Sequence, residues 1–385
     1  MRVHTFEFIS STSDWDEACK HLSMQDCIAV DIEANGLHAY PEHICLLQFA
    51  SRERIFLVDP AVLGSGSSLR KLTVDNKVVK IFHSCDYDMR SLDRDYHGRV
   101  HNLFDTAIAA QFLGSKRLGL GNVLNEFLEI TLEKSKKLQQ MDWGIRPLPD
   151  RALQYASDDV RYLIELRAHL TEKLQLLHRL DWVMEESRRM QDLRHRPPEP
   201  PEEAFKSIKG SRTLTPHQRA VLREVFLFRE LVSREYNRPP FKIMSAATLL
   251  ELAKHPRAKL STVPGLSTWL LKRAEKDLRE ALEHGRQAPP VVIPVIRRRS
   301  PWRSESLNRL GELKTWRKKQ GEVMSLDPSL LWPAASLERM ALHPETKDSE
   351  LFELPNSDVR KWQRKMFSEQ IAALPVWDTS HPVKK

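Results

Sequence analysis

The sequence has few cysteines and no long apolar run, and both absences narrow the possibilities. Its 4 cysteines include no CxxC pair, which argues against a disulfide-stapled scaffold or a cysteine-based zinc site and suits a reducing compartment. No stretch approaches 18 consecutive apolar residues, so we expect no membrane-spanning helix. The N-terminus lacks the pattern of a signal peptide, and no GxxxxGK[ST] loop of a nucleotide-driven motor occurs. We therefore expect a cytoplasmic protein with no membrane association.

Charged residues are unevenly distributed between the two halves of the chain. Residues 201–385 contain 34 lysines and arginines against 22 acidic residues, whereas residues 1–200 contain 26 against 30. Basic surfaces attract polyphosphate backbones, and acidic clusters hold metal ions. A solvated helical face rich in lysine and arginine would produce the same counts, so charge alone leaves both interpretations open.

Short apolar runs, separated by Gly, Pro and charged residues, dominate the first part of the chain and predict strands. They occur at 27–34, 44–51, 54–60 and 78–83, with a helical pattern at 69–75. Helical periodicity then takes over and continues to about residue 190. This order predicts an α/β domain over residues 1–195, with a mixed sheet flanked by helices.

The rest of the chain is helical and is interrupted by proline-rich linkers. We expect a linker at 196–209, an all-helical domain at 210–285, a second linker at 286–302, a second all-helical domain at 303–375 and a tail at 376–385. FKIMSAATLLELAKHP (241–256) resembles LLWPAASLERMALHP (330–344), and LSTVPG (260–265) resembles LFELPN (351–356). Two matches in the same order favour a duplicated domain.

Acidic residues stand at the end of one strand and at the start of one helix. Asp31 and Glu33 are two apart in the strand pattern AVDIEA, so both point to one face. Asp86 and Asp88 fall in the first turn of a helix that follows a strand. Either feature has a purely structural explanation, because strand ends are often solvated and acidic residues complement a helix dipole. We expect His83, at the end of that strand, to be a packed residue and not a ligand.

A third acidic element lies in LQYASDDVRYLI, at residues 153–164. Tyr155 and Asp159 are four apart on a predicted helix and share one face beside its apolar stripe, whereas Asp158 is expected to turn away. Taken alone, the pair would indicate only a structural hydrogen bond. Two carboxylates on one strand face repel each other unless a cation neutralises them, so the three elements together favour a metal site.

The order and spacing of these elements resemble the DEDD superfamily of 3′→5′ exonucleases, in its tyrosine-containing branch. The segments LLQFAS, FLVDP, KIFHSCDYDMRSL, LFDTAIAAQFLG and DWGIRPLPDRALQYASDDVRYL resemble ribonuclease D. The resemblance covers roughly residues 3–190, and the helical blocks resemble the HRDC domain, present twice with the second copy diverged. It implies a ribonuclease H-like exonuclease domain followed by two all-α HRDC-like domains.

The resemblance implies a catalytic role for five residues. Asp31, Glu33, Asp88 and Asp159 are expected to bind two divalent cations, Mg²⁺ or Mn²⁺, which clamp the attacking and leaving oxygens in phosphodiester hydrolysis. No other cofactor is expected. The ordinary pKa of tyrosine is about 10, so Tyr155 is expected to orient the attacking water and not to remove its proton.

Other residues are expected to play a part around the metals. Asp105, in LFDTAIA, is expected to support the site without binding metal. Asn35, Gly36 and Leu37 are expected to meet the terminal nucleotide. Arg146 fits a phosphate contact and a structural ion pair equally well.

The expected substrates are tRNA precursors and other structured small RNAs, trimmed from the 3′ end by a monomer that releases nucleoside 5′-monophosphates. The basic helices at 270–280 and 361–367 are expected to hold the RNA backbone. For Trp269, Trp316 and Trp362, stacking on bases and helix packing are both open, and helix packing is favoured. Two alternatives remain. One is a DNA 3′→5′ exonuclease, since such domains share the metal site, and the other is an RNA-binding protein with an inactive nuclease fold.

Overall fold

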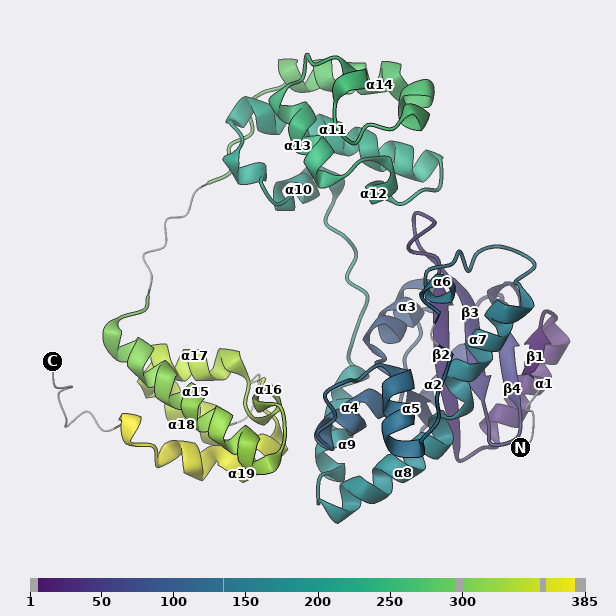
Figure 1. Cartoon of the computed structure of the whole chain (residues 1–385), viewed down its shortest axis with the longest axis vertical. Helices are drawn as coiled ribbons and strands as arrows, with labels where there is room; N and C mark the ends of the chain where they lie inside the picture. The colour runs from purple at the N-terminus through teal and green to yellow at the C-terminus, as the bar shows by residue number, and fades with distance from the viewer. Residues whose placement is uncertain (1–5, 134, 295–300, 354–357, 378–385) are drawn as a thin grey trace.

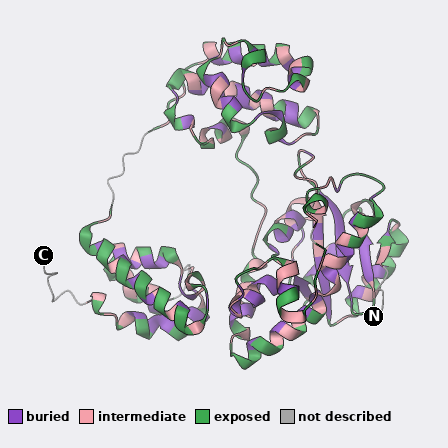
Figure 2. Ribbon diagram, viewed as in Figure 1, coloured by how far each residue is buried: buried purple, intermediate pink, exposed green. Residues whose placement is uncertain are grey.

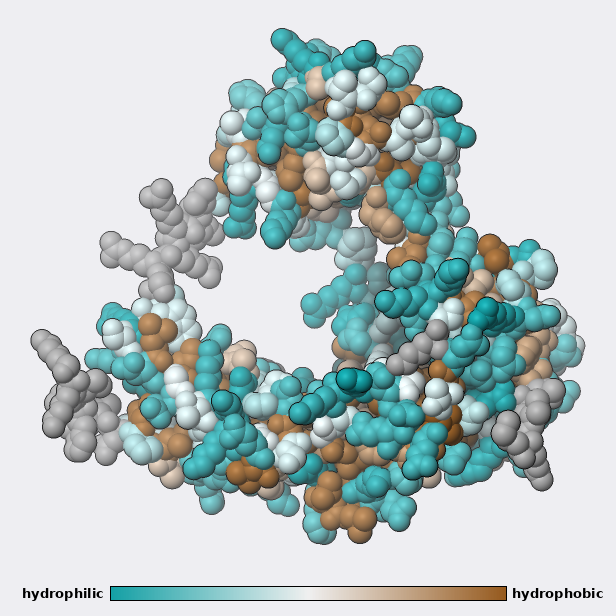
Figure 3. Space-filling view, viewed as in Figure 1, coloured by the Kyte–Doolittle hydropathy of each residue, from teal (hydrophilic) through white to brown (hydrophobic). Residues whose placement is uncertain are grey.

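The computed structural model of the chain describes residues 6–133, 135–294, 301–353 and 358–377. An α/β domain is followed by two helical domains, and the three lie around an open space (Figure 1; Figure 3). None of the described helices is both long and apolar enough to cross a membrane. All four cysteines are free, and Cys27, Cys45 and Cys85 are buried.

A mixed six-stranded sheet forms the centre of the α/β domain. Its order is β1-β4-β3-β2-β5-β6, in which β3 is antiparallel to both of its neighbours and the other pairs are parallel. The mixed sheet expected from the sequence is therefore confirmed. The expectation missed two short strands, β1 and β6, which have only four and three residues. The strands are β1 (Phe6–Ile9), β2 (Cys27–Ala34), β3 (Ile44–Ala50), β4 (Ile55–Val58), β5 (Val79–Phe82) and β6 (Leu103–Asp105).

Helices cover both faces of this sheet, so its strands are buried along most of their length (Figure 2). Residues Ile28, Val30 and Ile32 of β2 pack with α1, α2 and α3 on one face. The alternate residues, including Ala29, pack with α4, α7 and α8 on the other. The helices of this domain are α1 (Thr12–Ser23), α2 (Ser67–Val74), α3 (Asp86–Tyr96), α4 (Thr106–Phe112), α5 (Leu120–Leu128), α6 (Lys136–Gln139), α7 (Asp150–Arg161), α8 (Leu163–Leu176) and α9 (Leu180–Met190).

The two helical domains share one order of helices. In each, a long helix precedes a four-residue helix, and a nine-residue helix then ends at a histidine, His255 or His343, that adopts nearly the same backbone angles. This agreement supports the duplication inferred from the sequence. The first contains α10 (Pro201–Ala204), α11 (Pro216–Glu235), α12 (Pro240–Ile243), α13 (Ala246–Lys254) and α14 (Thr268–Gln287); the second contains α15 (Ser304–Met324), α16 (Pro328–Leu331), α17 (Ala334–Leu342), α18 (Lys347–Phe352) and α19 (Lys361–Ala372).

The second helical domain packs directly against the α/β domain. Trp362 of α19 stacks on Trp182 of α9 with ring centroids 4.4 Å apart, and its ring edge meets Phe112. Arg360 forms an ion pair of 2.6 Å with Glu186 beside this stack. One apolar core therefore extends across both domains, and Trp362 packs helices as expected.

Candidate active site

Two carboxylates lie on the face of β2 that α7 covers. Asp31 and Glu33 alternate with Val30 and Ile32, which are buried on the opposite face, so strand geometry sends both carboxylates the same way. The pairing of β2 with β3 shifts in register directly after Glu33. Such irregularities re-aim side chains at the ends of strands, and here one separates the acidic pair from the following loop.

The helix α7 brings the second part of the site over this face. Ala156 and Val160 are buried against the sheet, which places Tyr155 and Asp159 together on the adjoining side of the helix. The neighbouring Asp158 pairs instead with Arg161 at 2.8 Å. Asp158 therefore turns away from the site, as the helical period predicted.

The helix α3 supplies the fourth carboxylate. Asp88 is buried, whereas Asp86 in the same turn is exposed and pairs with Arg90 at 2.8 Å. The turn between β5 and α3 is held by Asp105, whose fully buried carboxylate accepts from the backbone N–H groups of Ser84 and Cys85 at 3.1 and 2.8 Å. Asp105 thus supports the turn that presents Asp88, in agreement with its expected role.

The five expected catalytic residues, drawn from three separate segments, line one cavity. It has a volume of about 280 Å³ and opens to solvent. Asp31, Glu33 and Asp159 each offer an oxygen within 4.8 Å of the others, and Asp88 lies on the wall of the same cavity. The complete lining is Asp31, Ile32, Glu33, His83, Tyr87, Asp88, Leu120, Gln139, Tyr155, Asp159 and Leu163.

Burial and mutual repulsion make these carboxylates reluctant to ionise without a cation. Burial raises the pKa of Asp31 to about 7. The pKa of Glu33, of Asp88 and of Asp159 is also raised, first by burial and then by the nearby charge of Asp31. A divalent cation would reverse both effects, because it compensates the lost hydration and neutralises the shared charge. The donor set of carboxylate oxygens suits Mg²⁺ or Mn²⁺.

The hydroxyl of Tyr155 lies among these acidic groups. Burial and the charge of Asp159 raise its pKa well above the ordinary value for tyrosine. The hydroxyl hydrogen-bonds Asp159 and thereby opposes part of the rise in the pKa of that carboxyl. A phenol with a raised pKa keeps its proton at neutral pH, which suits Tyr155 to a hydrogen-bonding role and not to that of a base.

Comparisons with known proteins agree with this geometry. Residues 6–175 match the model of a 3′-5′ exonuclease family, and residues 218–282 match the HRDC domain. Ribonuclease D of Sphingobium indicum is 32% identical over 277 residues, which cover 70% of this chain and 70% of that protein. The chain belongs to the ribonuclease D family. Ribonuclease D of Desulfotalea psychrophila is 28% identical over 336 residues, or 86% of this chain and 89% of that protein.

The fold comparison extends over the helical domains as well. The crystal structure of Escherichia coli RNase D, described as an exoribonuclease involved in structured RNA processing, matches with a TM-score of 0.69 at 21% identity. The match covers 96% of this chain and 98% of that one. The family and the fold expected from the sequence are therefore confirmed. As a member of the ribonuclease D family, the protein is a 3′-5′ exoribonuclease that uses divalent metal ions.

Sequence reasoning did not predict five residues that line the cavity in this ribonuclease D family member: Ile32, Tyr87, Leu120, Gln139 and Leu163. Gln139 hydrogen-bonds the Tyr155 hydroxyl and comes from the four-residue helix α6, whose sequence KKLQ has no distinctive period. His83 also lines the cavity, but its ring nitrogens lie 2.9 Å from the Thr106 hydroxyl and 2.7 Å from the Leu118 carbonyl. It is therefore a packed residue, as expected.

Hydrogen bonds account for two other residues near the ribonuclease D site. Arg146 donates to the Asp59 carboxylate at 2.6 Å and to the Cys45 carbonyl at 2.8 Å, so the structural ion pair is the correct reading. The side chain of Asn35 accepts from the backbone N–H of His43 at 2.8 Å and closes the loop that follows β2. Asn35, Gly36 and Leu37 lie outside the lining of the cavity.

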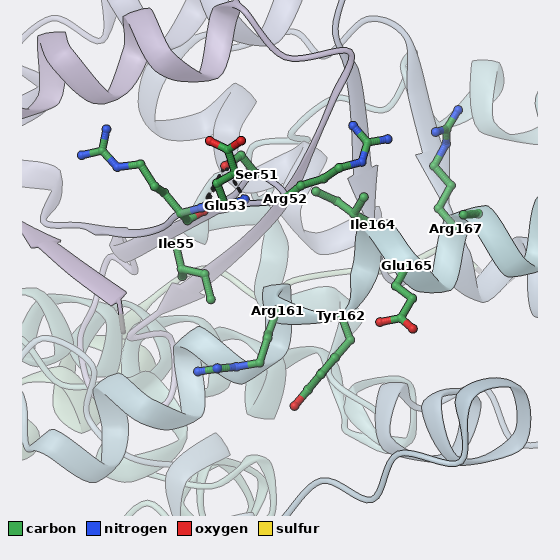
Figure 4. A pocket seen from close by; sticks show the side chains of 11 residues that line it. Ser51, Arg52, Glu53, Ile55, Arg161, Tyr162, Ile164, Glu165 and Arg167 are labelled. Carbon is green, nitrogen blue, oxygen red and sulfur yellow. Dashed lines mark hydrogen bonds between the residues drawn. The ribbon is translucent and has the colours of Figure 1, made fainter. Parts of the chain in front are cut away.

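A second cavity, of about 300 Å³, lies between the β3–β4 turn and the junction of α7 with α8 (Figure 4). It is lined by four arginines, but three of them already have carboxylate partners: Arg52 with Asp26, Arg54 with Glu7, and Arg161 with Asp158. Its acidic residues, Glu53 and Glu165, come from different elements and belong to no metal-sized cluster among the described residues. This cavity is therefore a weaker candidate for the active site than the acidic cavity.

Proposed function

We propose that this ribonuclease D family member removes nucleoside 5′-monophosphates from RNA 3′ ends with two bound Mg²⁺ or Mn²⁺ ions. One observation above all supports the proposal: four carboxylates and a tyrosine from β2, α3 and α7 line the same open cavity. A solvated strand end or a structural hydrogen bond would not require that convergence. It also makes the alternative of an inactive nuclease fold the weaker one.

The residues divide the work according to their chemistry. Asp31, Glu33, Asp88 and Asp159 would hold the cations, because their side chains line one cavity and three of them offer oxygens within 4.8 Å of one another. When bound, the cations supply a nucleophilic water at neutral pH and stabilise charge on the phosphate. Tyr155 keeps its proton and would orient that water through its hydroxyl.

We propose structured RNAs, tRNA precursors among them, as the substrates. Two features support this choice: the excess of basic residues after residue 200, and the similarity to Escherichia coli RNase D, an exoribonuclease involved in structured RNA processing. Basic helical domains add affinity for a phosphate backbone with little sequence preference. DNA is the alternative substrate, because a carboxylate metal site can serve either phosphodiester backbone, and contacts to the 2′-hydroxyl distinguish RNA.

We further propose the domain division expected from the sequence: a nuclease domain over 1–195, HRDC-like domains over 210–285 and 303–375, and linkers between them. A separate apolar core within residues 205–282 supports the middle domain. A monomer in the cytoplasm completes the proposal, and the four free cysteines suit that compartment.

Digestion of matched end-labelled RNA and DNA with Mg²⁺ or Mn²⁺ tests the proposal. The wild-type protein should shorten RNA from its 3′ end one nucleotide at a time and act more slowly on DNA. Asp31→Asn should abolish turnover, whereas Asp86→Asn, which removes an exposed carboxylate two residues from Asp88, should retain it. Full activity of Asp31→Asn would refute the site, and faster digestion of DNA would favour the alternative substrate.

A further inference from the structure

The first helical domain contacts the loop that leaves the active-site strand. The backbone N–H of Tyr40 donates to the Asn237 side chain at 2.9 Å, and the Tyr40 hydroxyl donates to Glu230 at 2.5 Å. The guanidinium of Arg234 lies over the Tyr40 ring at 5.2 Å. In Figure 1 this loop rises from the α/β domain toward α12. The turn between α11 and α12 is therefore fixed against the nuclease domain.

This loop is also tied to the wall of the acidic cavity. It begins directly after β2, two residues beyond Glu33. Within it, His38 hydrogen-bonds the carbonyl of Gln140 at 2.8 Å, and the neighbouring Gln139 lines the cavity. The α11–α12 turn is thus connected to the mouth of the active site in two ways: through the chain from Tyr40 back to Glu33, and through the hydrogen bond of His38 to Gln140.

Two arginines at this end of the first helical domain surround a tryptophan. The guanidinium carbons of Arg238, in the α11–α12 turn, and Arg273, in α14, lie 4.3 and 4.9 Å from the centre of the Trp269 ring. Tyr236 meets the same ring edge-on at 5.1 Å. Trp269 is only partly buried. Helix packing, the role expected for it, therefore explains only part of its surface.

The side chains of Arg238 and Arg273 have no hydrogen bond or ion pair with any other described residue. Other arginines on α11 and α14 have carboxylate partners: Arg229 pairs with Glu230, Arg279 with Glu275, and Arg286 with Glu283. Two guanidinium groups attracted to one ring repel each other, and the ring offsets only part of that repulsion. Their unused N–H donors and uncompensated charge are what an anion with several oxygens would satisfy.

We propose that Arg238 and Arg273 bind neighbouring phosphates of the RNA chain just upstream of the 3′ end held in the acidic cavity. The inference rests on the proposed function and names the part of the substrate that the first helical domain holds. Arginine suits this task because its planar fork donates two parallel hydrogen bonds to one phosphate. Trp269 keeps both forks in place, which reduces the conformational entropy lost on binding.

The test is RNA binding by the full-length double variant Arg238→Gln/Arg273→Gln. The probe is a fluorescent single-stranded RNA of about 12 nucleotides, titrated without divalent metal at several salt concentrations. Each lost phosphate contact lowers the log–log salt slope by about 0.7 for a single strand. We expect the slope to fall by about 1.4 and the affinity to fall roughly 50-fold at 50 mM salt. A DNA strand of the same sequence should lose the same slope, because the contacts are to phosphate.

Two further variants separate a specific site from general charge. Arg279→Gln/Arg286→Gln makes the same change in net charge on α14, but at arginines already paired with Glu275 and Glu283, and should leave the slope nearly unchanged. Arg238→Lys/Arg273→Lys keeps both charges and should retain most of the slope. An equal loss in the Arg279/Arg286 control, or no loss in the Arg238→Gln/Arg273→Gln variant, would overturn the proposal.

Failure of this inference is distinguishable from failure of the proposed function. The binding measurement needs no metal and no hydrolysis. A wild-type protein that binds RNA with the expected slope yet does not shorten it with Mg²⁺ or Mn²⁺ would refute the exonuclease mechanism and leave the phosphate site intact. Hydrolysis by a protein in which Arg238 and Arg273 do not affect the slope would do the opposite.

Discussion

Replacing Asp31 by asparagine should make the metal-free protein more stable while removing its activity. Asp31 is the carboxylate whose charge raises the pKa of Glu33, Asp88 and Asp159. Folding without metal forces these groups together out of bulk water. An asparagine of nearly the same shape removes one charge from the cluster and adds an amide that can donate to its neighbours.

The expected size of this gain follows from the pKa of Asp31. Burial raises that pKa from 3.8 to about 7, a difference that corresponds to about 4 kcal/mol. The cavity is open, and water in it reduces the cost, so we expect a gain of about 1–3 kcal/mol at pH 8. Because a raised carboxyl pKa makes the folded state bind more protons, the metal-free wild type loses stability as the pH rises from about 4 to 7. The gain should therefore be smaller at pH 5.

Thermal unfolding in a chelator, with and without added Mn²⁺, measures the effect. Asp31→Asn should unfold about 2–10 °C above the wild type at pH 8 without metal. Mn²⁺ should raise the unfolding temperature of the wild type by mass action and leave the variant nearly unchanged. Asp86→Asn is the matched control. It removes the exposed partner of Arg90 and should give no gain.

Two results would contradict this reasoning. A lower unfolding temperature for metal-free Asp31→Asn would mean that the carboxylates do not repel one another in the folded protein. An equal response of variant and wild type to Mn²⁺ would place the metal elsewhere. A gain of the same size in Asp86→Asn would show that removing any negative charge from this acidic half is enough.

Three further predictions follow from neighbouring contacts. Tyr155→Phe should slow hydrolysis up to about 100-fold yet keep the stabilisation by Mn²⁺, and loss of that stabilisation would make the tyrosine a metal-site residue. Gln48 is fully buried on β3 opposite Asp31, and neither of its amide atoms has a hydrogen-bond partner among the described residues. Gln48→Met should therefore raise the free energy of unfolding by about 1 kcal/mol. It should also weaken Mn²⁺ binding about tenfold. Truncation after Arg196 should cost about 2–5 kcal/mol in chemical denaturation, because it uncovers Trp182; unchanged stability would mean that the domains are independent.

The carboxylates of the site were predictable because their placement depends on short-range geometry. A strand repeats every two residues and a helix every 3.6, so Asp31 with Glu33, and Tyr155 with Asp159, share a face whatever the rest of the fold. Strand and helix periods do not show that the segments carrying these residues meet in space. The family resemblance implied it, because it gives the arrangement of β2, β5 and α7 in the fold. The short strands β1 and β6 were missed because runs of four and three residues show no usable period, and β6 continues directly into the helical pattern of α4.

The tryptophans and arginines were not predictable in this way, because their roles depend on residues far away in the chain. Trp362 and Trp269 both open basic amphipathic helices. Trp362 is buried because α9 places Trp182 against it, whereas Trp269 is only partly buried against the core of its own domain and also contacts two arginines and a tyrosine. Arg146 and Arg238 likewise have similar sequence surroundings, since each directly precedes a proline. Asp59 pairs with Arg146, whereas no described carboxylate pairs with Arg238. An unpaired charge in the domain that contacts the active-site loop is therefore the feature that a structure adds to a recognised motif, and it is where contact with RNA should be sought.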